Sequence, residues 1–480
     1  MGGLGRSVRG VDPQHLLLGE GGQEPVTEVG AVLVDQGQEG LELAFNHWLA
    51  GESGAKRVLK DSLGRSVENV ASINPPRHGK DLRTSIDLRI QYLAYRALKS
   101  AIQKYNAESG SIVVLDVETG EVLAIANQPS YNPNDRSQFS AERYRNRAIT
   151  DIFEPGSSIK PLIVAAALES GDYRPSSIID TAPGYVVVGP KTIEDSRNLG
   201  RVTLTTILAR SSNVGVTKLA MSLEPEQLWN TMTRFGLGTL TTSGFPGEPA
   251  GLLTPYNHWR DINQATLAYG YGISVTPLQL AQAYAILGSN GVARPVSLVA
   301  LDGQPDGDRV LASDSANAVK RMLEEVVRPG GTGTKAAIDG YRIAGKTGTA
   351  QKSAPDGSGY IDDKYVASFA GYVPARQPRL AAIFVIDGLD AECVSVVGRV
   401  GVDPDRGPLP CMTFEDQHGG AIADLTLDHP LERSGTEGGI ESLPRELGHR
   451  TVVDVELRER LHLRGAIHVE AGVPVHLHEH

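Results

Sequence analysis

Three apolar segments with the character of β-strands follow one another late in the chain, in Tyr341–Gly348, Val366–Val373 and Arg379–Asp387. Two more lie far earlier, in Ser111–Asn127, where a polar turn ending at Gly120 predicts a hairpin. An early hairpin, helices in the middle and three late strands predict one five-stranded antiparallel sheet. With helices on both faces of that sheet, the predicted fold class is α+β.

The predicted helices carry their own start and stop signals. Apolar residues recur at helical spacing over 90–101, behind Asp87, which is a suitable N-cap. A second helix is predicted over 157–170 and ends at Gly171. A third covers 276–288, where a threonine, a proline and a glutamine form the start signal known as a capping box. These helices supply the layers that the sheet needs.

Composition excludes several classes of protein. The 46 basic and 57 acidic residues give the 480-residue chain a net charge of −11, without a basic arm, which argues against nucleic acid as the main partner. The two cysteines, Cys393 and Cys411, provide no disulfide framework. No stretch approaches the roughly 20 apolar residues that cross a bilayer, and the first residues lack the apolar middle of a signal peptide. Taken by itself, the chain is predicted to be soluble.

The candidate catalytic residues form three short motifs in a fixed order. Ser157 and Lys160 are three apart at the start of a predicted helix, which places a hydroxyl and an amine on one face. The helix N-terminus adds positive potential near that serine. Ser211 and Asn213 form Ser-x-Asn, and Lys346 opens a Lys-Thr-Gly on a predicted strand. A nucleophile, a nearby base and donors for an oxyanion are what acyl transfer needs.

Taken singly, two of these motifs are weak signals. Ser53 and Lys56 repeat the first spacing without other catalytic residues around them. Ser-x-Asn recurs elsewhere, for example at Ser72–Asn74, Ser130–Asn132 and Ser315–Asn317. Lys-Thr-Gly occurs once. The three in this order are typical of serine β-lactamases and penicillin-binding proteins, so their conjunction predicts a catalytic serine.

Two other enzymatic classes fit part of the chain. Residues 340–347 match the P-loop pattern G-x-x-x-x-G-K-T. A P-loop must be a turn that leads into a helix, whereas the middle residues here have strand character and 348–351 start no helix. For a β-lactamase, Glu226 and Asn230 resemble a deacylating pair, but they lie in a segment with ordinary helical periodicity. The glycine-rich run 330–335 is predicted to be a tight loop. A transpeptidase is therefore favoured, with a β-lactamase or penicillin sensor, and more remotely a nucleotide hydrolase, as alternatives.

Several longer segments carry a family resemblance that runs from about Gly37 to Asp387. They are FEPGSSIKP, ARSSNVG, YGYGISVTPLQLAQAYA, GGTGTKA, AGKTGTAQK and GSIVVLDVETGEVLAIANQPSYNPND. The chain resembles the class B penicillin-binding proteins, and among them the division-specific peptidoglycan D,D-transpeptidases of the penicillin-binding protein 3 group. The resemblance implies the penicillin-binding, β-lactamase-like transpeptidase fold, with no cofactor and no metal.

The resemblance assigns the catalytic roles. Ser157 would attack the carbonyl of the penultimate D-Ala of a stem peptide and form an acyl-enzyme. Lys160, as a neutral amine, would take the serine proton, and both burial and the charge of Lys346 would lower its pKa as this requires. Ser211 would relay a proton to the leaving amine. Asn213 would hold Lys160 and the substrate amide.

The resemblance also assigns the substrate-binding residues on the Lys-Thr-Gly strand. Lys346 would supply positive potential, and Thr347 and Thr349 would bind the terminal carboxylate of the substrate. Gly348 would let an acyl chain lie against the strand without a side-chain clash. The backbone N–H groups of Ser157 and Thr349 would form the oxyanion hole.

The implied partners are peptidoglycan stem peptides that end in D-Ala-D-Ala, β-lactam antibiotics, a lipid II polymerase and division proteins. Residual carboxypeptidase activity belongs to the same chemistry. The implied location is the periplasmic face of the inner membrane, although the membrane anchor and signal expected of the family are not found in this chain.

The predicted domains are four. Residues 81–388 form the transpeptidase domain, and 35–80, with a helical segment over 41–49, are the remnant of an N-terminal dimerisation or pedestal module. Residues 1–34 do not resemble the family, and 389–480 form an atypical tail without lysine, tyrosine or asparagine. The helix that follows the last strand in the family is not found. Both ends are therefore expected to derive from a frameshift, misassembly or fusion, and the tail histidines are expected to be disordered rather than metal ligands.

Overall fold

The computed structural model describes residues 27–31, 36–60, 66–132, 137, 140–391 and 393. Contacts divide the chain into two units. The N-terminal unit contains the chain up to Gln36 together with Asn46–Asp81, and the second unit contains Gly37–Phe45 and everything from Leu82 onward. The predictions for 1–34 and 389–480 fall largely outside the described residues.

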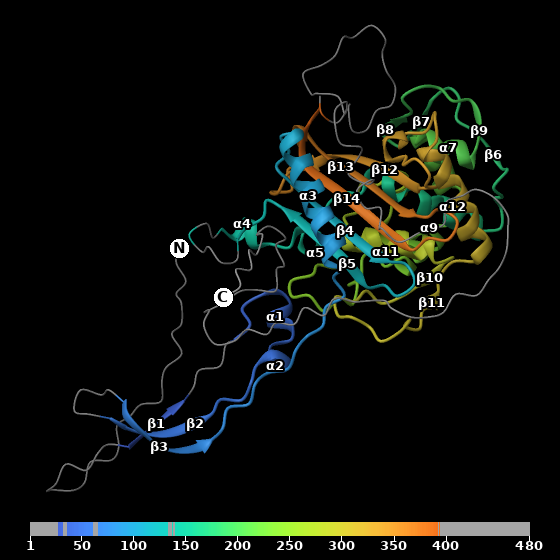
Figure 1. Ribbon diagram of the computed structural model, residues 1–480. Helices are drawn as coiled ribbons and strands as arrows, with labels where there is room; N and C mark the ends of the chain where they lie inside the picture. Colours follow the sequence, from blue (N-terminus) through green and yellow to red (C-terminus); the bar gives the residue numbers. More distant parts are fainter. Residues whose placement is uncertain are drawn as a thin grey trace, which may run out of the picture. The chain divides into compact units, whose positions relative to one another are not determined.

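The N-terminal unit is built on a small antiparallel sheet. Its strands are β1 (Thr27–Ala31), β2 (Ala55–Lys60) and β3 (Ser66–Asn74), paired in that order (Figure 1). The helix predicted over 41–49 is instead two short helices, α1 (Gly40–Ala44) and α2 (Asn46–Leu49). Phe45 separates them, and the division into units falls at the same point. The apolar spacing continues through this break, which is why periodicity alone predicts one helix.

The second unit contains the predicted five-stranded antiparallel sheet, in the order β12-β13-β14-β4-β5 (Figure 1). Its strands are β4 (Ser109–Asp116), β5 (Val122–Gln128), β12 (Ala344–Ser353), β13 (Tyr360–Val373) and β14 (Leu380–Asp390). Each late strand is longer than its apolar pattern, because backbone pairing continues beyond the last buried side chain. The early hairpin joins the late strands through β14, where Ile383 is opposite Val113.

Alternate side chains of the central strands enter two different cores. On β4, Ile112 and Val114 contact one layer, which contains α3 (Leu88–Lys104). The intervening Val113 and Leu115 face the larger core, which contains α11 (Pro277–Gly288) and α12 (Ser313–Val327). This period of two is what a sheet covered on both faces requires. The α+β prediction with helices on both faces is confirmed, and Figure 1 shows the sheet between these layers.

The predicted helix signals are present as hydrogen bonds. The side chain of Asp87 accepts a 2.9 Å bond from Arg89 N at the start of α3. At the start of α11, Thr276 Oγ1 accepts from Gln279 N at 3.0 Å, and Gln279 Oε1 accepts from Thr276 N at 2.8 Å. These caps depend only on neighbouring residues, so the sequence is sufficient to predict them.

The remaining helices and two-stranded ribbons surround the larger core or lie at its edge. The helices are α4 (Ala141–Tyr144), α5 (Arg147–Thr150), η2 (Gly156–Ile159), α6 (Lys160–Glu169), α7 (Leu204–Arg210), α8 (Asn213–Met221), α9 (Pro225–Arg234), η3 (Tyr256–His258), α10 (Asp261–Leu267) and η4 (Thr334–Ala336). Two-stranded ribbons pair β6 (Ile178–Asp180) with β9 (Arg201–Thr203), β7 (Tyr185–Val188) with β8 (Lys191–Glu194), and β10 (Val292–Ala293) with β11 (Asp308–Arg309).

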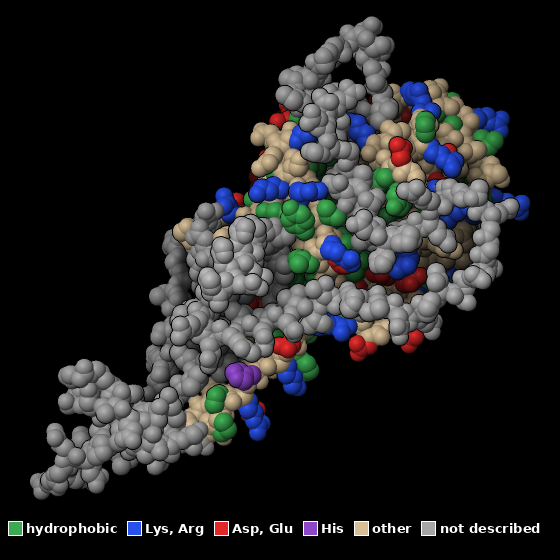
Figure 2. Space-filling model, in the orientation of Figure 1, with side chains coloured by type: hydrophobic (Ala, Val, Ile, Leu, Met, Phe, Trp, Pro, Cys, Tyr) green, Lys and Arg blue, Asp and Glu red, His purple; other side chains and the backbone are tan. Residues whose placement is uncertain are grey.

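On the face of the molecule drawn in Figure 2, acidic and basic side chains of the described residues are interspersed with hydrophobic ones. Within the described part of the chain, none of the helices has both the length and the apolar character needed to cross a membrane.

Candidate active site

The candidate nucleophile lies on a tight turn in front of a helix. Ser157 belongs to the 3₁₀ helix η2, and the α-helix α6 begins only at Lys160, so the prediction that Ser157 opens an α-helix is corrected. The backbone N–H of Lys160 donates to Ser157 O, an i to i+3 bond. Because a 3₁₀ helix has three residues per turn, the two side chains still share one face. The local sequence favours this turn, since Gly156 has φ +53°.

Two glycines let this turn approach β12. A Cβ on Gly156 would lie 2.5 Å from Thr349 O, and a Cβ on Gly348 would lie 2.7 Å from Pro155 O and 2.3 Å from Ser368 Oγ. These contacts give a reason for a glycine at Gly348 besides the predicted one. A side chain there would collide with the serine turn and with β13, so the small residue keeps the nucleophile against the strand.

The candidate base, Lys160, is buried, and its amine lies within hydrogen-bond distance of three acceptors. Lys160 is 0% exposed, and its Nζ lies 2.6 Å from Ser211 O, 2.7 Å from Asn213 Oδ1 and 3.2 Å from Ser211 Oγ. Ser211 ends α7 in the left-handed region, at φ +57°, and Asn213 begins α8. The strained residue turns the chain between two helices, and this turn directs two acceptors of the second motif at the lysine.

Lys346 approaches the same hydroxyl from the sheet. It is 0% exposed on β12, and its Nζ lies 3.0 Å from Ser211 Oγ and 2.9 Å from Thr347 O. Ser211 Oγ is thus in hydrogen-bond distance of both lysine amines. The structure brings the lysines of the first and third motifs together around a serine of the second.

Burial disfavours the charged forms of both lysines, and at Lys160 the positive charge of Lys346 adds to this effect. The pKa of Lys160 is held well below its ordinary value, first by burial and next by the positive charge of Lys346, whereas Asp195 raises it. Burial lowers the pKa of Lys346 to about 7. A neutral amine has two N–H groups, which Ser211 O and Asn213 Oδ1 accept, and a lone pair left for a proton.

Thr347 and Thr349 are less buried than their neighbours on β12. Thr347 and Thr349 alternate with the buried Lys346 and Gly348 along β12, so the two hydroxyls lie on one face of the strand. Within the described structure the Oγ of Ser157 has no hydrogen-bond partner, so the hydroxyl is free to turn. β12 is an edge strand, and one side of its backbone is left unpaired by the sheet.

Three residues of the site have no signal in the sequence motifs. Asp195, after β8, accepts from Ser212 Oγ at 2.6 Å, and Glu194 O accepts from Asn213 Nδ2 at 3.1 Å. Thr332 Oγ1 lies 2.9 Å from Thr347 Oγ1. Thr332 belongs to the glycine-rich run 330–335, of which 330–333 form the predicted loop after α12, whereas Thr334 and Lys335 already belong to η4. Glu194 and Asp195 lie far from any motif, so only the folded chain identifies them.

A polar and aromatic cluster borders the far end of β12. Glu154 Oε1 accepts from Gly272 N at 2.8 Å, and Gln351 N donates to the hydroxyl of Tyr271 at 3.3 Å. The ring centroids of Tyr271 and Tyr360 are 5.8 Å apart in an edge-to-face arrangement. Burial raises the pKa of Glu154, and the bond from Gly272, the Tyr360 hydroxyl and Lys191 oppose this effect. The cluster thus joins the chain before η2 and the Tyr271 segment to the end of β12.

The alternative chemistries lack their structural context. Gly345 to Thr347 lie inside β12 and the strand continues to Ser353, so this segment is not the turn before a helix that a P-loop needs. Glu226 is exposed on α9, where Leu228 and Met232 are buried, as an ordinary surface helix requires.

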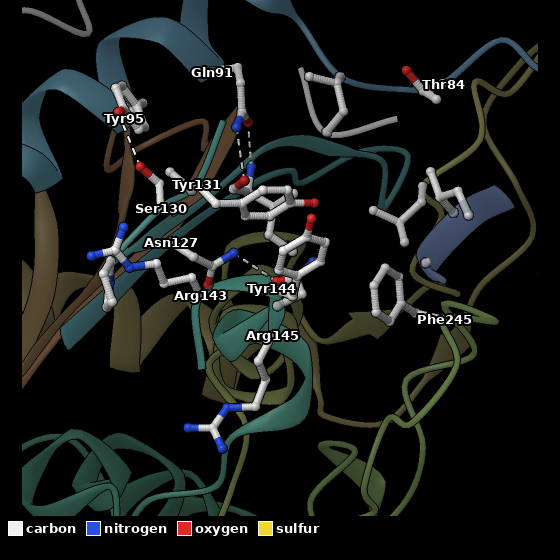
Figure 3. A pocket seen from close by; sticks show the side chains of 18 residues that line it. Thr84, Gln91, Tyr95, Asn127, Ser130, Tyr131, Arg143, Tyr144, Arg145 and Phe245 are labelled. Atoms are coloured by element: carbon white, nitrogen blue, oxygen red, sulfur yellow. Dashed lines mark hydrogen bonds between the residues drawn. The ribbon is translucent and has the colours of Figure 1, made fainter. Parts of the chain in front are cut away.

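A cavity of about 100 Å³ lies elsewhere in the second unit, beside the edge strand β5 (Figure 3). Figure 3 shows the stacked rings of Tyr131 and Tyr144, whose centroids are 4.0 Å apart. Gln91 pairs with the backbone of Ile125 through bonds of 2.8 and 2.7 Å, which covers part of the free edge of the sheet. No residue of the three motifs lines this cavity.

A serine turn held against the edge strand of this sheet, with two buried lysines on one hydroxyl, defines the fold class that penicillin-binding proteins share with serine β-lactamases. The family model described as Penicillin binding protein transpeptidase domain matches residues 110–396, and that described as Penicillin-binding Protein dimerisation domain matches 34–84. The chain belongs to the penicillin-binding protein transpeptidase family.

Individual relatives agree with the resemblance to class B penicillin-binding proteins, which is confirmed. The chain is 48% identical over 360 residues to the peptidoglycan D,D-transpeptidase FtsI of Escherichia coli K12, covering 75% of this chain and 60% of that protein. It is 41% identical over 354 residues to the probable peptidoglycan D,D-transpeptidase PenA of Neisseria flavescens, covering 73% and 88%. The apo structure of the TP domain of Burkholderia pseudomallei penicillin-binding protein 3 has a TM-score of 0.59 and 41% identity, covering 64% of this chain and 88% of that one. The chain thus spans about three fifths of the length of the E. coli relative.

Proposed function

We propose that the chain is a serine-type peptidoglycan D,D-transpeptidase, which cross-links stem peptides during septal wall synthesis and is acylated by β-lactams. One observation carries the proposal: Ser211 Oγ lies 3.2 Å from Lys160 Nζ and 3.0 Å from Lys346 Nζ, beside the turn that presents Ser157. The relatives that share these segments are named peptidoglycan D,D-transpeptidases.

In the acylation step Ser157 Oγ attacks the carbonyl carbon of the penultimate D-Ala. Its proton passes to the lone pair of Lys160, because burial lowers the pKa of this lysine and so favours the neutral amine. The negative charge that develops on the carbonyl oxygen is met by the N–H groups of Ser157 and Thr349, each of which is worth about 3 kcal/mol in such a site. The Gly156 and Gly348 contacts keep the turn and the strand close enough for both donors to serve one oxygen.

Collapse of the tetrahedral intermediate breaks the bond between carbon and the amine of the terminal D-Ala. That amine needs a proton, and Lys160 now carries one. Ser211 Oγ lies within reach of Lys160 Nζ, so its hydroxyl passes the proton on while Lys346 stabilises its oxygen. The products are an ester on Ser157 and a released D-Ala.

The substrate is held by its terminal carboxylate and by its backbone. Thr347 and Thr349 present hydroxyls on one face of β12, and Lys346 adds positive charge behind them. Thr332 fixes the hydroxyl of Thr347. The stem peptide would lie along the unpaired side of β12 as an added strand, a common way for an edge strand to recognise an extended peptide.

In the second half of the reaction the amine of a neighbouring stem peptide attacks the ester on Ser157. Lys160 accepts the proton of the amine, and Ser157 recovers its own proton as the new amide forms. Water in place of the amine gives carboxypeptidase activity. A β-lactam leaves its opened ring attached to the acyl group, so no leaving group departs to clear the way for the acceptor.

The relatives also support a cellular setting for the reaction. Proteins named FtsI and PenA match along most of this chain. We place the protein on the periplasmic face of the inner membrane, with a lipid II polymerase and division proteins as its partners.

The test is mass spectrometry of the purified chain after exposure to benzylpenicillin, with Ser157→Ala as the control. A persistent adduct with the mass of the intact drug, on Ser157 and absent from the variant, is expected. A transient adduct with continuous hydrolysis of the drug would instead indicate a β-lactamase. A folded chain that forms no adduct would overturn the proposal.

A further inference from the structure

The loop that follows β8 contacts the second motif at several atoms. Asp195 Oδ1 accepts from Asn213 N at 2.5 Å and from Val214 N at 3.0 Å, and Asp195 Oδ2 accepts from Ser212 Oγ at 2.6 Å. These N–H groups are the unpaired donors at the start of α8, where a carboxylate is favoured by the helix dipole. The backbone of Asp195 is held in turn by a 2.9 Å bond to Gly184 O.

The last residue of β8, Glu194, determines which atom of Asn213 faces the catalytic lysine. Glu194 O accepts from the side-chain nitrogen of Asn213 at 3.1 Å, so this nitrogen points away from Lys160. The side-chain oxygen is left to meet Lys160 Nζ at 2.7 Å. An amide turned the other way would bring its oxygen against Glu194 O, and its N–H groups would compete for the lone pair that Lys160 needs to accept the serine proton.

Asp195 also supplies a negative charge that acts on Lys160. Two charged groups of the described structure act on Lys160: Lys346, from β12, and Asp195, from the loop after β8. Their effects have opposite signs, because a like charge disfavours the protonated amine and an opposite charge favours it.

We propose that Asp195 is a positioning residue for acylation, which fixes the start of α8 so that Asn213 Oδ1 meets Lys160 and which partly balances the charge of Lys346. The proposal rests on the proposed function, since it assigns Asp195 a part in the same reaction. Asp195 acts through Asn213 and Lys160 and does not contact the reacting atoms.

Two substitutions separate the role of the Asp195 hydrogen bonds from the role of its negative charge. Asp195→Asn keeps an oxygen for the two backbone N–H groups and removes the charge. Asp195→Ala removes both. Asp180 lies in β6, is exposed and bonds locally to Ala182 N at 2.9 Å, so Asp180→Asn is a matched control that changes the net charge equally.

The measurement is the second-order rate constant for acylation by benzylpenicillin between pH 5 and 10, with the adduct on Ser157 counted by mass spectrometry. Loss of the negative charge lets Lys160 stay neutral at lower pH, so Asp195→Asn is expected to move the acid limb of the profile down by at least half a pH unit. Asp195→Ala is expected to lower the plateau rate at least tenfold further. Asp180→Asn is expected to follow the wild type.

Every other outcome contradicts a specific part of the proposal. If the acid limb of Asp195→Asn coincides with that of the wild type, the charge of Asp195 has no role. If Asp195→Ala is acylated at the wild-type rate, the hydrogen bonds of Asp195 have no role. If Asp195→Ala does not fold, as judged by circular dichroism, the shift in Asp195→Asn decides alone. If the wild type acylates on Ser157 and both variants match it, only this inference fails. If the wild type forms no adduct, the proposed function fails and this inference falls with it.

Discussion

Ser211 Oγ lies 3.0 Å from Lys346 Nζ, although 135 positions separate the two residues in the chain. One comes from the left-handed turn between α7 and α8, and the other from the buried side of an edge strand. The hydroxyl therefore stands between two amines only when the helical layer is docked on the sheet. This dependence lets the roles of single residues be tested against controls that leave the docking intact.

Replacing Lys160 with arginine is expected to abolish acylation while it keeps a positive charge in the site. A guanidinium stays protonated at accessible pH and has no lone pair for the serine proton. General base catalysis of this kind is worth about 10²–10⁴-fold, so the acylation rate of Lys160→Arg is expected to fall by at least about 10²-fold. Lys218→Arg on α8, where the amine bonds to Asp180 O at the surface, is the matched control. Retention of more than a tenth of the wild-type rate in Lys160→Arg would show that another group is the base.

The pH profile of acylation is expected to have an acid limb set by Lys160 and a basic limb set by Lys346. Lys160 must be neutral, which holds above its own low pKa, and Lys346 must be positive, which holds below about 7. The rate constant should therefore rise with pH on the acid side and decline above about pH 7. Lys346→Arg keeps its charge at high pH, so its basic limb is expected to move upward by more than about one unit.

The position of the basic limb, and not the height of the profile, is the readout, because an arginine also changes packing in the buried site. Benzylpenicillin acylation measured from pH 5 to 10 on both proteins gives this position. A wild-type rate that stays level to pH 9, or an identical limb in Lys346→Arg, would contradict the assignment of that limb to Lys346.

Gly156→Ala is expected to destabilise the protein by about 2–4 kcal/mol and to lower acylation sharply. A positive φ costs a residue with a Cβ about 1–2 kcal/mol, and the Cβ would also lie 2.5 Å from Thr349 O, so the serine turn must shift from β12. Gly171→Ala is the control, because Gly171 has φ +83° with nothing within 4 Å of its Cβ. It is expected to cost only the conformational part and to acylate normally. Urea unfolding and acylation rates check both variants, and equal effects in the two would refute the close contact.

What the sequence predicts well in this chain is local. The cap of α3 at Asp87 and the capping box at Thr276 involve residues two or three apart, and both are present. Apolar runs also locate the five strands, because each strand of a covered sheet needs buried side chains. The order of the three motifs identifies Ser157, Lys160 and Lys346 as candidate catalytic residues. The family resemblance points to the same residues, and the comparisons confirm that resemblance.

What the sequence does not predict is the set of contacts between distant segments. Asp195 has no motif, and its importance follows from the approach of the β7–β8 ribbon to the start of α8. The 3₁₀ turn at Ser157 depends on the space that β12 leaves beside Gly156. The break at Phe45 interrupts a continuous helical pattern. In the first two cases a contact between distant segments determines the local structure, and a local pattern does not encode such a contact.

Thr332→Val is expected to weaken binding of the acyl donor and to leave the chemical step nearly unchanged. Thr332 Oγ1 lies 2.9 Å from Thr347 Oγ1, and the proposed role of Thr347 is to bind the terminal carboxylate. Valine has the same shape without the hydroxyl, so Thr347 loses the partner that orients it. One hydrogen bond contributes about 1 kcal/mol, which corresponds to about a fivefold rise in the apparent dissociation constant of benzylpenicillin.

Thr332→Ser supplies the control within the same position, since it keeps the hydroxyl and removes only a methyl group. Saturation kinetics of acylation separate the apparent dissociation constant from the limiting rate constant. If Thr332 orients Thr347, only the valine variant raises the dissociation constant, and its limiting rate constant stays within about twofold of the wild type. Equal weakening in both variants would assign Thr332 to loop packing. A loss confined to the limiting rate constant would place its hydroxyl in the chemical step, because an interaction made only in the transition state changes the rate and leaves ground-state binding unaltered.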